Sequence, residues 1–388
     1  MADSPALPLE LHQEILRWLP VKSLMRFKCI SVTWHSIIKD PSLALVYRAG
    51  SRGLLVVEHP EPEEGTNEKT VFTFVNLNFE GYGPRTYLLR RSTVDHSKFG
   101  GDWEQMQTTM VVNGLVCFYG VKRLCLYNIA TRESLEVVPV QCQVNPPNEN
   151  FFAYFLGFDP VNKLYKLLLL FISKEAQTAQ SRRNWKILTI GVDSSWRDIC
   201  LPPMDASNNP LNKSTRLRYL DGVLYWLNGS NANHPMVAFD FFQEKFQLIP
   251  LPNPEGCPRK YNLLSFGPIA IAVMSESPES NERVIVRYNN NRRKSGELAK
   301  GNWGDEEKYV IPSEEVCLQG ILPSEKLILS HYFESPAYIY LFDPVKRESK
   351  EIVLWNNPFL FPQQSNPVNY YEENIISLRS LTSISGPQ

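Results

Sequence analysis

Apolar and polar residues alternate in two different ways along this chain. Near the N-terminus, Leu11, Ile15, Leu16 and Leu19 recur at the spacing of one helical face. Pro20 follows at once and cannot continue a helix. This pattern predicts a short amphipathic helix that ends before Pro20.

Two more short helices are predicted in the same region. Val21, Leu24 and Met25 again have helical spacing, and Ser31 is suited to cap the third helix, which residues 40–41 (Asp-Pro) end. Three short helices make a poor independent core. Their large apolar side chains therefore pack on a partner or on the rest of the chain, and the pattern favours neither alternative.

From about residue 50 the pattern changes to short β-type runs separated by turns. Residues 53–57 and 70–75 are apolar and rich in β-branched or aromatic side chains. The pairs at 113–114 (Asn-Gly) and 221–222 (Asp-Gly) lie between apolar runs, which is a strong hairpin signal. This part of the chain is expected to be all-β.

A second repeated element is an apolar strand that ends in Asp or Asn before a polar turn. It recurs at Asn128, Asp159, Asp240 and Asp343, whose side chains can accept hydrogen bonds from the backbone two residues on. Together with the hairpins, these elements define about six units of roughly 50 residues each, the length of one four-stranded propeller blade.

The predicted architecture therefore has two domains. An all-α module of three helices occupies residues 1–48, and an all-β domain, a β-propeller of about six to eight blades, occupies residues 49–388. Residues 370–378 form a late strand that can complete the first blade and close the ring. A stacked pair of β-sandwiches is the structural alternative.

The N-terminal region resembles an F-box over nearly the whole motif. One departure is Val32, where the plant family usually has lysine. The matching residues are Leu7-Pro8-x-Glu10-Leu11-x-x-Glu14-Ile15-Leu16-x-x-Leu19-Pro20-Val21-Lys22-Ser23-Leu24-x-Arg26-Phe27-Lys28-Cys29-x-Ser31-x-x-Trp34-x-x-Ile37-x-x-Asp40-Pro41.

This resemblance implies that the module docks on a Skp-type adaptor, which a cullin scaffold holds. An amphipathic helical module can place a few large apolar anchors in a groove of its partner. The residues that match the family's adaptor-facing positions are Leu7, Pro8, Ile15, Leu16, Leu19, Pro20, Val21, Leu24 and Trp34.

The β-rich region resembles the F-box-associated domain of the large plant F-box family. The matching segments are 157–160 (Gly-Phe-Asp-Pro) through 165–166 (Tyr-Lys), 221–226, 239–240 with 244–246, and the closing 371–378. S-locus F-box proteins share this layout. The resemblance implies a substrate receptor of a ubiquitin ligase, whose propeller binds an unidentified protein substrate and whose chemistry occurs on other subunits.

Composition narrows the classes of partner. The chain has 388 residues, 43% of them hydrophobic, and a formal net charge of −1, which offers no general attraction for nucleic acid or anionic lipid. No apolar run is long enough to span a bilayer. The seven cysteines include no C-x-x-C pair and suggest neither disulfides nor zinc. A cytoplasmic or nuclear protein is expected.

No catalytic, cofactor-binding or metal-binding motif is recognised, so we expect a non-catalytic subunit. Two alternatives stay open: a scaffold that binds the adaptor without a cullin, and a propeller with its own hydrolase or carbohydrate-binding activity. Substrate-binding residues are not assigned. The candidates for substrate contact are the longest irregular stretches, at 82–106, 141–150, 176–184, 204–216 and 289–307.

Overall fold

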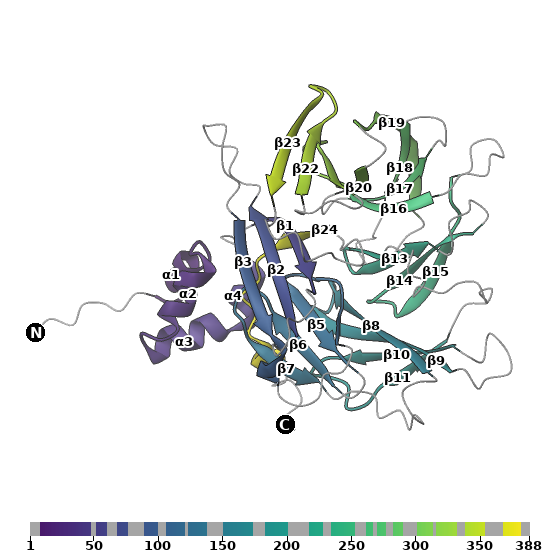
Figure 1. Cartoon of the computed structure of the whole chain (residues 1–388). Helices are drawn as coiled ribbons and strands as arrows, with labels where there is room; N and C mark the ends of the chain where they lie inside the picture. Colours follow the sequence, from purple (N-terminus) through teal and green to yellow (C-terminus); the bar gives the residue numbers. More distant parts are fainter. Residues whose placement is uncertain are drawn as a thin grey trace, which may run out of the picture.

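The helices gather on one side of a ring of sheets (Figure 1). The helices are α1 (Leu9–Leu16), α2 (Val21–Phe27), α3 (Val32–Lys39) and α4 (Pro41–Val46). The computed structural model describes residues 8–47, 52–59, 68–76, 89–99, 106–120, 123–137, 150–173, 183–200, 217–227, 234–252, 261–266, 270–276, 282–289, 301–312, 316–331, 338–353 and 368–381.

The helical module has one helix more than predicted. The backbone N–H of Trp34 donates to Ser31 Oγ over 3.2 Å, which confirms the predicted cap of α3. Asp40 and Pro41 end α3 but also begin α4, because Asp40 Oδ1 accepts from the N–H of Ser42 over 2.8 Å. Proline is well tolerated in the first turn of a helix, where its missing N–H leaves no bond unmade. The expectation of three helices was therefore wrong by this one turn.

The described strands form six four-stranded units, which we name blades 1 to 6. Blade 1 contains β24 (Val368–Glu372), β1 (Arg52–Glu58), β2 (Lys69–Asn76) and β3 (Leu89–Asp95); blade 2 contains β4 (Gln107–Thr108), β5 (Leu115–Tyr119), β6 (Leu124–Asn128) and β7 (Ser134–Val137); blade 3 contains β8 (Asn150–Asp159), β9 (Leu164–Ser173), β10 (Arg183–Thr189) and β11 (Arg197–Ile199).

The second half of the ring repeats this plan. Blade 4 contains β12 (Leu217–Leu220), β13 (Val223–Leu227), β14 (Met236–Asp240) and β15 (Lys245–Ile249); blade 5 contains β16 (Tyr261–Phe266), β17 (Ala270–Glu276), β18 (Glu282–Asn289) and β19 (Asn302–Val310); blade 6 contains β20 (Val316–Ile321), β21 (Leu327–His331), β22 (Tyr338–Asp343) and β23 (Glu348–Val353). Within each blade the neighbouring strands are antiparallel, and a short parallel pairing of β16 with β20 joins blades 5 and 6. Two short 3₁₀ helices, η1 (His96–Phe99) and η2 (Leu378–Leu381), follow β3 and β24.

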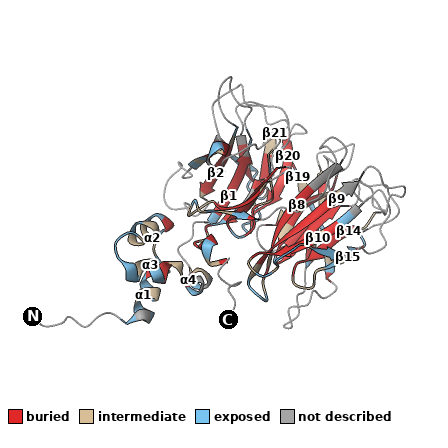
Figure 2. Cartoon of the chain, turned by 90° about the horizontal axis from the view of Figure 1, so that it is seen from below, coloured by how far each residue is buried: buried red, intermediate tan, exposed pale blue. Residues whose placement is uncertain are grey.

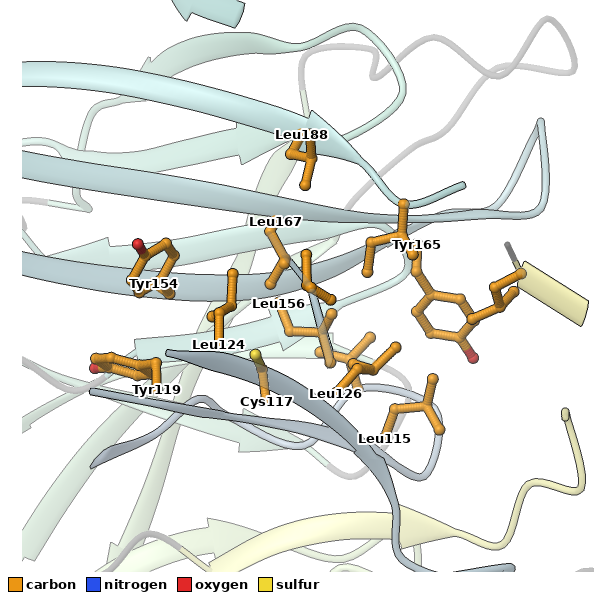
Figure 3. Close-up of a cluster of buried hydrophobic side chains, with 14 of the residues drawn as sticks. Leu115, Cys117, Tyr119, Leu124, Leu126, Tyr154, Leu156, Tyr165, Leu167 and Leu188 are labelled. Atoms are coloured by element: carbon orange, nitrogen blue, oxygen red, sulfur yellow. The ribbon is translucent and has the colours of Figure 1, made fainter. Parts of the chain in front are cut away.

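Buried side chains fill the space between each blade and the next, and they close the ring. Figure 3 shows one such core, in which Leu124 and Leu126 of blade 2 face Leu156 and Leu167 of blade 3. Equivalent clusters join blades 1 and 2, 3 and 4, 4 and 5, and 5 and 6. A sixth cluster joins blade 6 to blade 1. Figure 2 shows that buried positions dominate strands such as β1, β2, β8 and β10. A closed ring of this kind confirms the propeller and excludes stacked sandwiches.

The predicted turns form as expected. Asn113 and Gly114 have φ angles of 46° and 76°, and Asp221 and Gly222 have 43° and 79°, the left-handed pair that a two-residue hairpin requires. Asn128, Asp159, Asp240 and Asp343 each accept hydrogen bonds from the two backbone N–H groups that lie two and three residues further on.

The same capped turn carries a further internal repeat. The residue four positions after each capping side chain has a φ angle between 54° and 62°: these residues are Arg132, Lys163, Glu244 and Arg347. Four blades thus share one turn conformation. Because the cap fixes the turn, neighbouring strands leave it in the same register each time.

The F-box-associated motifs meet at one interblade contact. Lys166 Nζ of blade 3 lies 3.2 Å from Asp159 Oδ2, 2.9 Å from Glu244 Oε1 and 2.7 Å from the carbonyl oxygen of Phe241. Glu244 and Phe241 belong to the β14–β15 turn of blade 4. Arg197 of β11 also binds Glu244, over 2.7 and 2.9 Å. We call these charged residues the blade 3–4 ion cluster.

Two stretches predicted to be loops contain strands. The 82–106 stretch holds β3 and η1, and the 289–307 stretch holds the first part of β19. Both strands are the outermost of their blades, and exposed positions dominate the burial pattern of β19. An outer strand faces solvent, so polar residues replace the apolar run by which strands are recognised. The stretches 141–150, 176–184 and 204–216 lie outside the described residues, apart from residue 150 of β8 and residues 183–184 of β10.

The C-terminal segment closes the ring, as predicted. β24 pairs antiparallel with β1, with Val368 opposite Val56 and Glu372 opposite Arg52. Beyond β24, the Asn128 side-chain amide donates to the carbonyl oxygens of Asn374 and Ile376, over 3.1 and 3.0 Å. The segment therefore serves as the inner strand of blade 1 and then runs along blade 2.

A buried histidine gives the fold a specific pH dependence. His96 Nε2 lies 2.9 Å from Thr70 Oγ1, and burial lowers the pKa of His96 to about 4 from its ordinary 6.5. Between these values the unfolded chain binds the proton and the folded chain does not. His96 alone should therefore lower the free energy of unfolding as the pH drops from 6.5 to 4, by at most about 3 kcal/mol. Urea unfolding at pH 7 and pH 4.5 measures the change, and His96→Gln should reduce it. An equal change in both proteins would contradict this assignment.

Candidate partner-docking site

The helical module has a compact core of its own. All four of its helices contribute, and Ile375 from the C-terminal segment completes it. The buried members are Leu16, Val21, Leu24, Ile37, Ile38, Leu43 and Ile375. An apolar residue from the other end of the chain thus lies inside the module, so the module and the propeller are packed together.

One carboxylate fastens the module to the propeller. Glu133 Oε1 lies 2.7 Å from Lys28 Nζ, while its Oε2 accepts from Ser377 Oγ over 3.0 Å and from the N–H of Leu378 over 2.9 Å. Burial alone would raise the pKa of Glu133, but Lys28 and these hydrogen bonds lower it below its ordinary value. Glu133 therefore stays charged at neutral pH and joins the module, blade 2 and the C-terminal segment.

A stripe of apolar side chains along α1 and the turn after it faces solvent. Leu11 and Ile15 lie four residues apart on α1, and Trp18 follows three residues later, in the turn just beyond the end of the helix. Their exposed fractions are 48%, 48% and 58%. Trp18 is held at the surface by Glu14, 3.4 Å from its indole Nε1, and by the Arg17 guanidinium, 5.3 Å from its ring centre. We call these three residues the α1 stripe.

The helical module exposes further apolar residues. Eleven large apolar side chains are exposed in the part of the chain that the structure describes, and six of them lie within residues 8–47: Leu11, Ile15, Trp18, Ile30, Val32 and Val46. Such a concentration on so small a module is typical of a surface that a partner covers. One apolar set therefore packs inward, on the module itself and on Ile375, and another faces solvent, whose contact with a partner stays a prediction.

The structure divides the predicted adaptor-facing residues into three groups. Pro8, Ile15 and Pro20 are exposed, and Leu19 and Trp34 are partly buried. Leu16, Val21 and Leu24 are 0 to 4% exposed in the module core, so they hold the helices together. Leu7 lies outside the described residues. Adaptor contact by the accessible members stays a prediction.

The ring of Trp34 is partly buried and packs against two other rings of the module. It meets His12 edge-on at 4.9 Å and lies 5.6 Å from Phe27, measured between ring centres.

We missed Leu11 and Trp18 as candidate contact residues in the sequence, although their spacing from Ile15 is visible there. The signal that could have identified them is this second set of regularly spaced apolar residues, next to the set that is buried.

The propeller has a cavity of about 340 Å³ whose lining comes from several blades. Its polar lining includes Arg218, Asp221, Tyr370 and Glu372. Glu372 is already paired with Arg52 over 2.8 Å.

Within the described ranges, no three His, Cys, Asp or Glu side chains gather as a metal site would require. No helix in the same ranges is long and apolar enough to cross a membrane. The buried residues Cys117, Cys125 and Cys317 form no disulfide bonds.

Comparison with protein families assigns both parts of the chain. Residues 5–45 match the F-box domain, and residues 67–371 match the F-box associated beta propeller domain. An F-box protein of Arabidopsis thaliana, At4g38870, is 28% identical over 64% of this chain and 58% of its own length. A second F-box protein of the same plant, At3g10240, is 25% identical over 91% of this chain and 86% of its own length. An F-box/LRR-repeat protein of the same plant is 22% identical over 90% of this chain and 78% of its own length.

Solved structures are more distant. An oligogalacturonate lyase is 10% identical over 76% of this chain and 77% of its own length, with a TM-score of 0.39. A six-bladed fungal lectin is 8% identical over 81% of this chain and 97% of its own length, with a TM-score of 0.34. Neither likeness bears on activity. The two family matches do cover most of the chain, which is a plant F-box protein with an F-box-associated β-propeller domain.

Proposed function

We propose that this protein is the substrate-recognition subunit of a Skp–cullin–F-box ubiquitin ligase. The helical module docks on a Skp-type adaptor, the cullin binds through that adaptor, and the propeller binds the protein to be ubiquitinated. The subunit itself is non-catalytic and works in the cytoplasm or nucleus. Tethering a substrate near the charged enzyme raises its effective concentration, to the millimolar range for short flexible links.

The α1 stripe is the observation that carries this proposal. Leu11 and Ile15 on α1 and Trp18 in the turn after it are exposed, and nothing in the described part of the chain covers them. A helix that presents apolar residues at this spacing fits a hydrophobic groove. Tryptophan is among the residues that most often dominate the binding energy of an interface. The adaptor interface should therefore be centred on Ile15 and Trp18.

Charge substitutions on the α1 stripe test the proposal. Ile15→Asp combined with Trp18→Asp should weaken adaptor binding by roughly 1,000-fold, since central apolar anchors contribute at least about 2 kcal/mol each. Binding to purified adaptor is measured by calorimetry or interferometry. Both side chains are largely exposed, so the module should stay folded. Leu16→Asp is a poor test, because Leu16 is fully buried and its loss would unfold the module.

The propeller offers a matched control. Val310 and Val345 are 66% and 89% exposed, and they lie on β19 and in the turn between β22 and β23. Val310→Asp with Val345→Asp adds the same charge to exposed apolar positions and should leave adaptor affinity unchanged. If the α1 variant binds as tightly as the control, the docking surface is wrong. Deleting residues 1–48 is less informative, because it would uncover Ile375 and Glu133.

Cullin recruitment separates a ligase receptor from a scaffold. A receptor should co-purify with both adaptor and cullin from plant extract, and the α1 variant should lose both. Recovery of the adaptor without any cullin would contradict the ligase role and support a scaffold that binds the adaptor alone.

A further inference from the structure

A cleft opens where the F-box module meets the propeller. It has a volume of about 680 Å³, within the range of small-molecule sites. Helix α2, strand β3 and the β6–β7 turn provide most of its lining, and Glu373 follows β24. We call it the junction cleft. It lies apart from the α1 stripe, whose residues are not among those that line it.

The charged residues of the junction cleft are nearly all cationic. The cations are Lys22, Arg26, Arg90, Arg91 and Arg132, and the single carboxylate is Glu373. That carboxylate is bound to Arg90 over 2.7 Å. Five cations and one anion leave a local charge of +4, although the whole chain carries −1. The cationic character is therefore a local property of this cleft.

Three of these cations lack an internal counter-ion. Lys22, Arg26 and Arg132 make no ion pair within the part of the chain that the structure describes. Arg132 is fixed in place by the capped turn, since its N–H donates to the carbonyl oxygen of Asn128 over 2.8 Å. Like charges held together repel each other, and a bound anion relieves that repulsion.

Three apolar residues of the lining belong to the core between blades 1 and 2. Leu55, Phe72 and Phe74 are 0 to 6% exposed, so they form a packed floor. Lys22, Arg26, Arg90, Arg91 and Arg132 are exposed and line the same cleft. Guanidinium groups bind phosphate oxygens through paired N–H donors, and several of them together match a ligand with more than one charge.

We propose that the junction cleft binds a small molecule that carries several phosphate groups. Lys22 and Arg26 come from the F-box module, and Arg90, Arg91 and Arg132 come from the propeller. A ligand held by both sets joins the two domains and fixes their orientation. Under the proposed ligase function, this would set the distance between adaptor and substrate. Binding of the ligand to the cleft does not depend on which partner the module has.

Tripolyphosphate is the probe for this site, applied to the full chain. It should bind measurably by calorimetry and raise the melting temperature, because a ligand that binds only the folded state stabilises it. Sodium chloride at matched ionic strength should do neither. Equal effects of the two salts would show general screening and overturn the proposal.

Charge reversal locates the site. Lys22→Glu with Arg26→Glu should weaken tripolyphosphate binding by about tenfold or more, since each loses a charge-assisted contact. Lys245→Glu with Lys346→Glu is the matched control, because both lysines are exposed, neither lines the cleft, and the net charge changes equally. Circular dichroism checks that each variant is folded. Equal losses in the two variants would contradict the proposed site.

A phosphoserine peptide is the competing ligand. It carries one phosphate on an extended chain and should bind more weakly than tripolyphosphate, because it satisfies fewer of the cations. If such a peptide bound more tightly and the Lys22–Arg26 variant lost that binding, the cleft would be a phosphopeptide site and the small-molecule proposal would be wrong.

Discussion

Replacing Lys166 by methionine is expected to lower the free energy of unfolding of the propeller by about 3–5 kcal/mol. The Lys166 side chain is 6% exposed, and Asp159, 3.2 Å away, is fully buried. Methionine keeps most of the volume but leaves the carboxylate of Asp159 without its cation. Urea unfolding followed by tryptophan fluorescence measures the effect, because Trp185 and Trp226 lie in the core that joins the same two blades.

A surface pair provides the control for Lys166. Lys186 lies 2.7 Å from Asp198, but its side chain is 28% exposed and that of Asp198 is 81% exposed. Lys186→Met should therefore cost less than about 1 kcal/mol. Equal losses for the two lysines would contradict a structural role for the blade 3–4 ion cluster.

A compensating substitution separates lost charge balance from lost packing. Asp159→Asn removes the stranded carboxylate from the Lys166→Met protein, and an amide can still cap the turn, as Asn128 does in blade 2. Glu244 keeps Arg197 as its partner. The double variant should recover part of the lost stability, because a buried ion pair can be replaced by neutral groups at small cost. No recovery would show that packing accounts for the loss.

The sequence predicts the parts of this fold that are encoded locally. The Asn-Gly and Asp-Gly hairpins and the four capped turns depend on residues within a few positions, and all formed as expected. The inner strands are long apolar runs and were also visible. Outer strands such as β3 and β19 face solvent and carry polar residues, so their sequences look like those of loops.

The candidate site was predicted only in part, for a related reason. Helical spacing identifies an apolar face, but it does not say what covers that face. Leu16 and Leu24 pack inside the module, whereas Ile15 and Trp18 point outward. Ile375 completes the module core from 350 or so positions away, and no local pattern indicates such a contact. The junction cleft likewise gathers cations from separate segments.

Ending the chain at residue 367 should produce the largest effect of all. It removes β24, whose pairing with β1 supplies the inner strand of blade 1. It also removes Ile375 from the module core and Leu378 and Leu381 from the core between blades 2 and 3. Each such loss costs about 2–5 kcal/mol, so together they approach the whole stability of a typical domain. The exposed edge of β1 should then promote aggregation.

A chain that ends at residue 381 is the matched control, since it keeps every described contact of the segment. It should elute as a monomer in size-exclusion chromatography and unfold at the temperature of the full chain, whereas the chain ending at 367 should be aggregated or unfolded. Ile375→Ala removes only the contact with the module, so it should lower the stability of the helices by about 2–4 kcal/mol and leave the propeller ring closed. If the chain ending at 367 stays monomeric and melts normally, β24 is not what closes the ring, because strands β1 to β23 would then be sufficient for a stable fold.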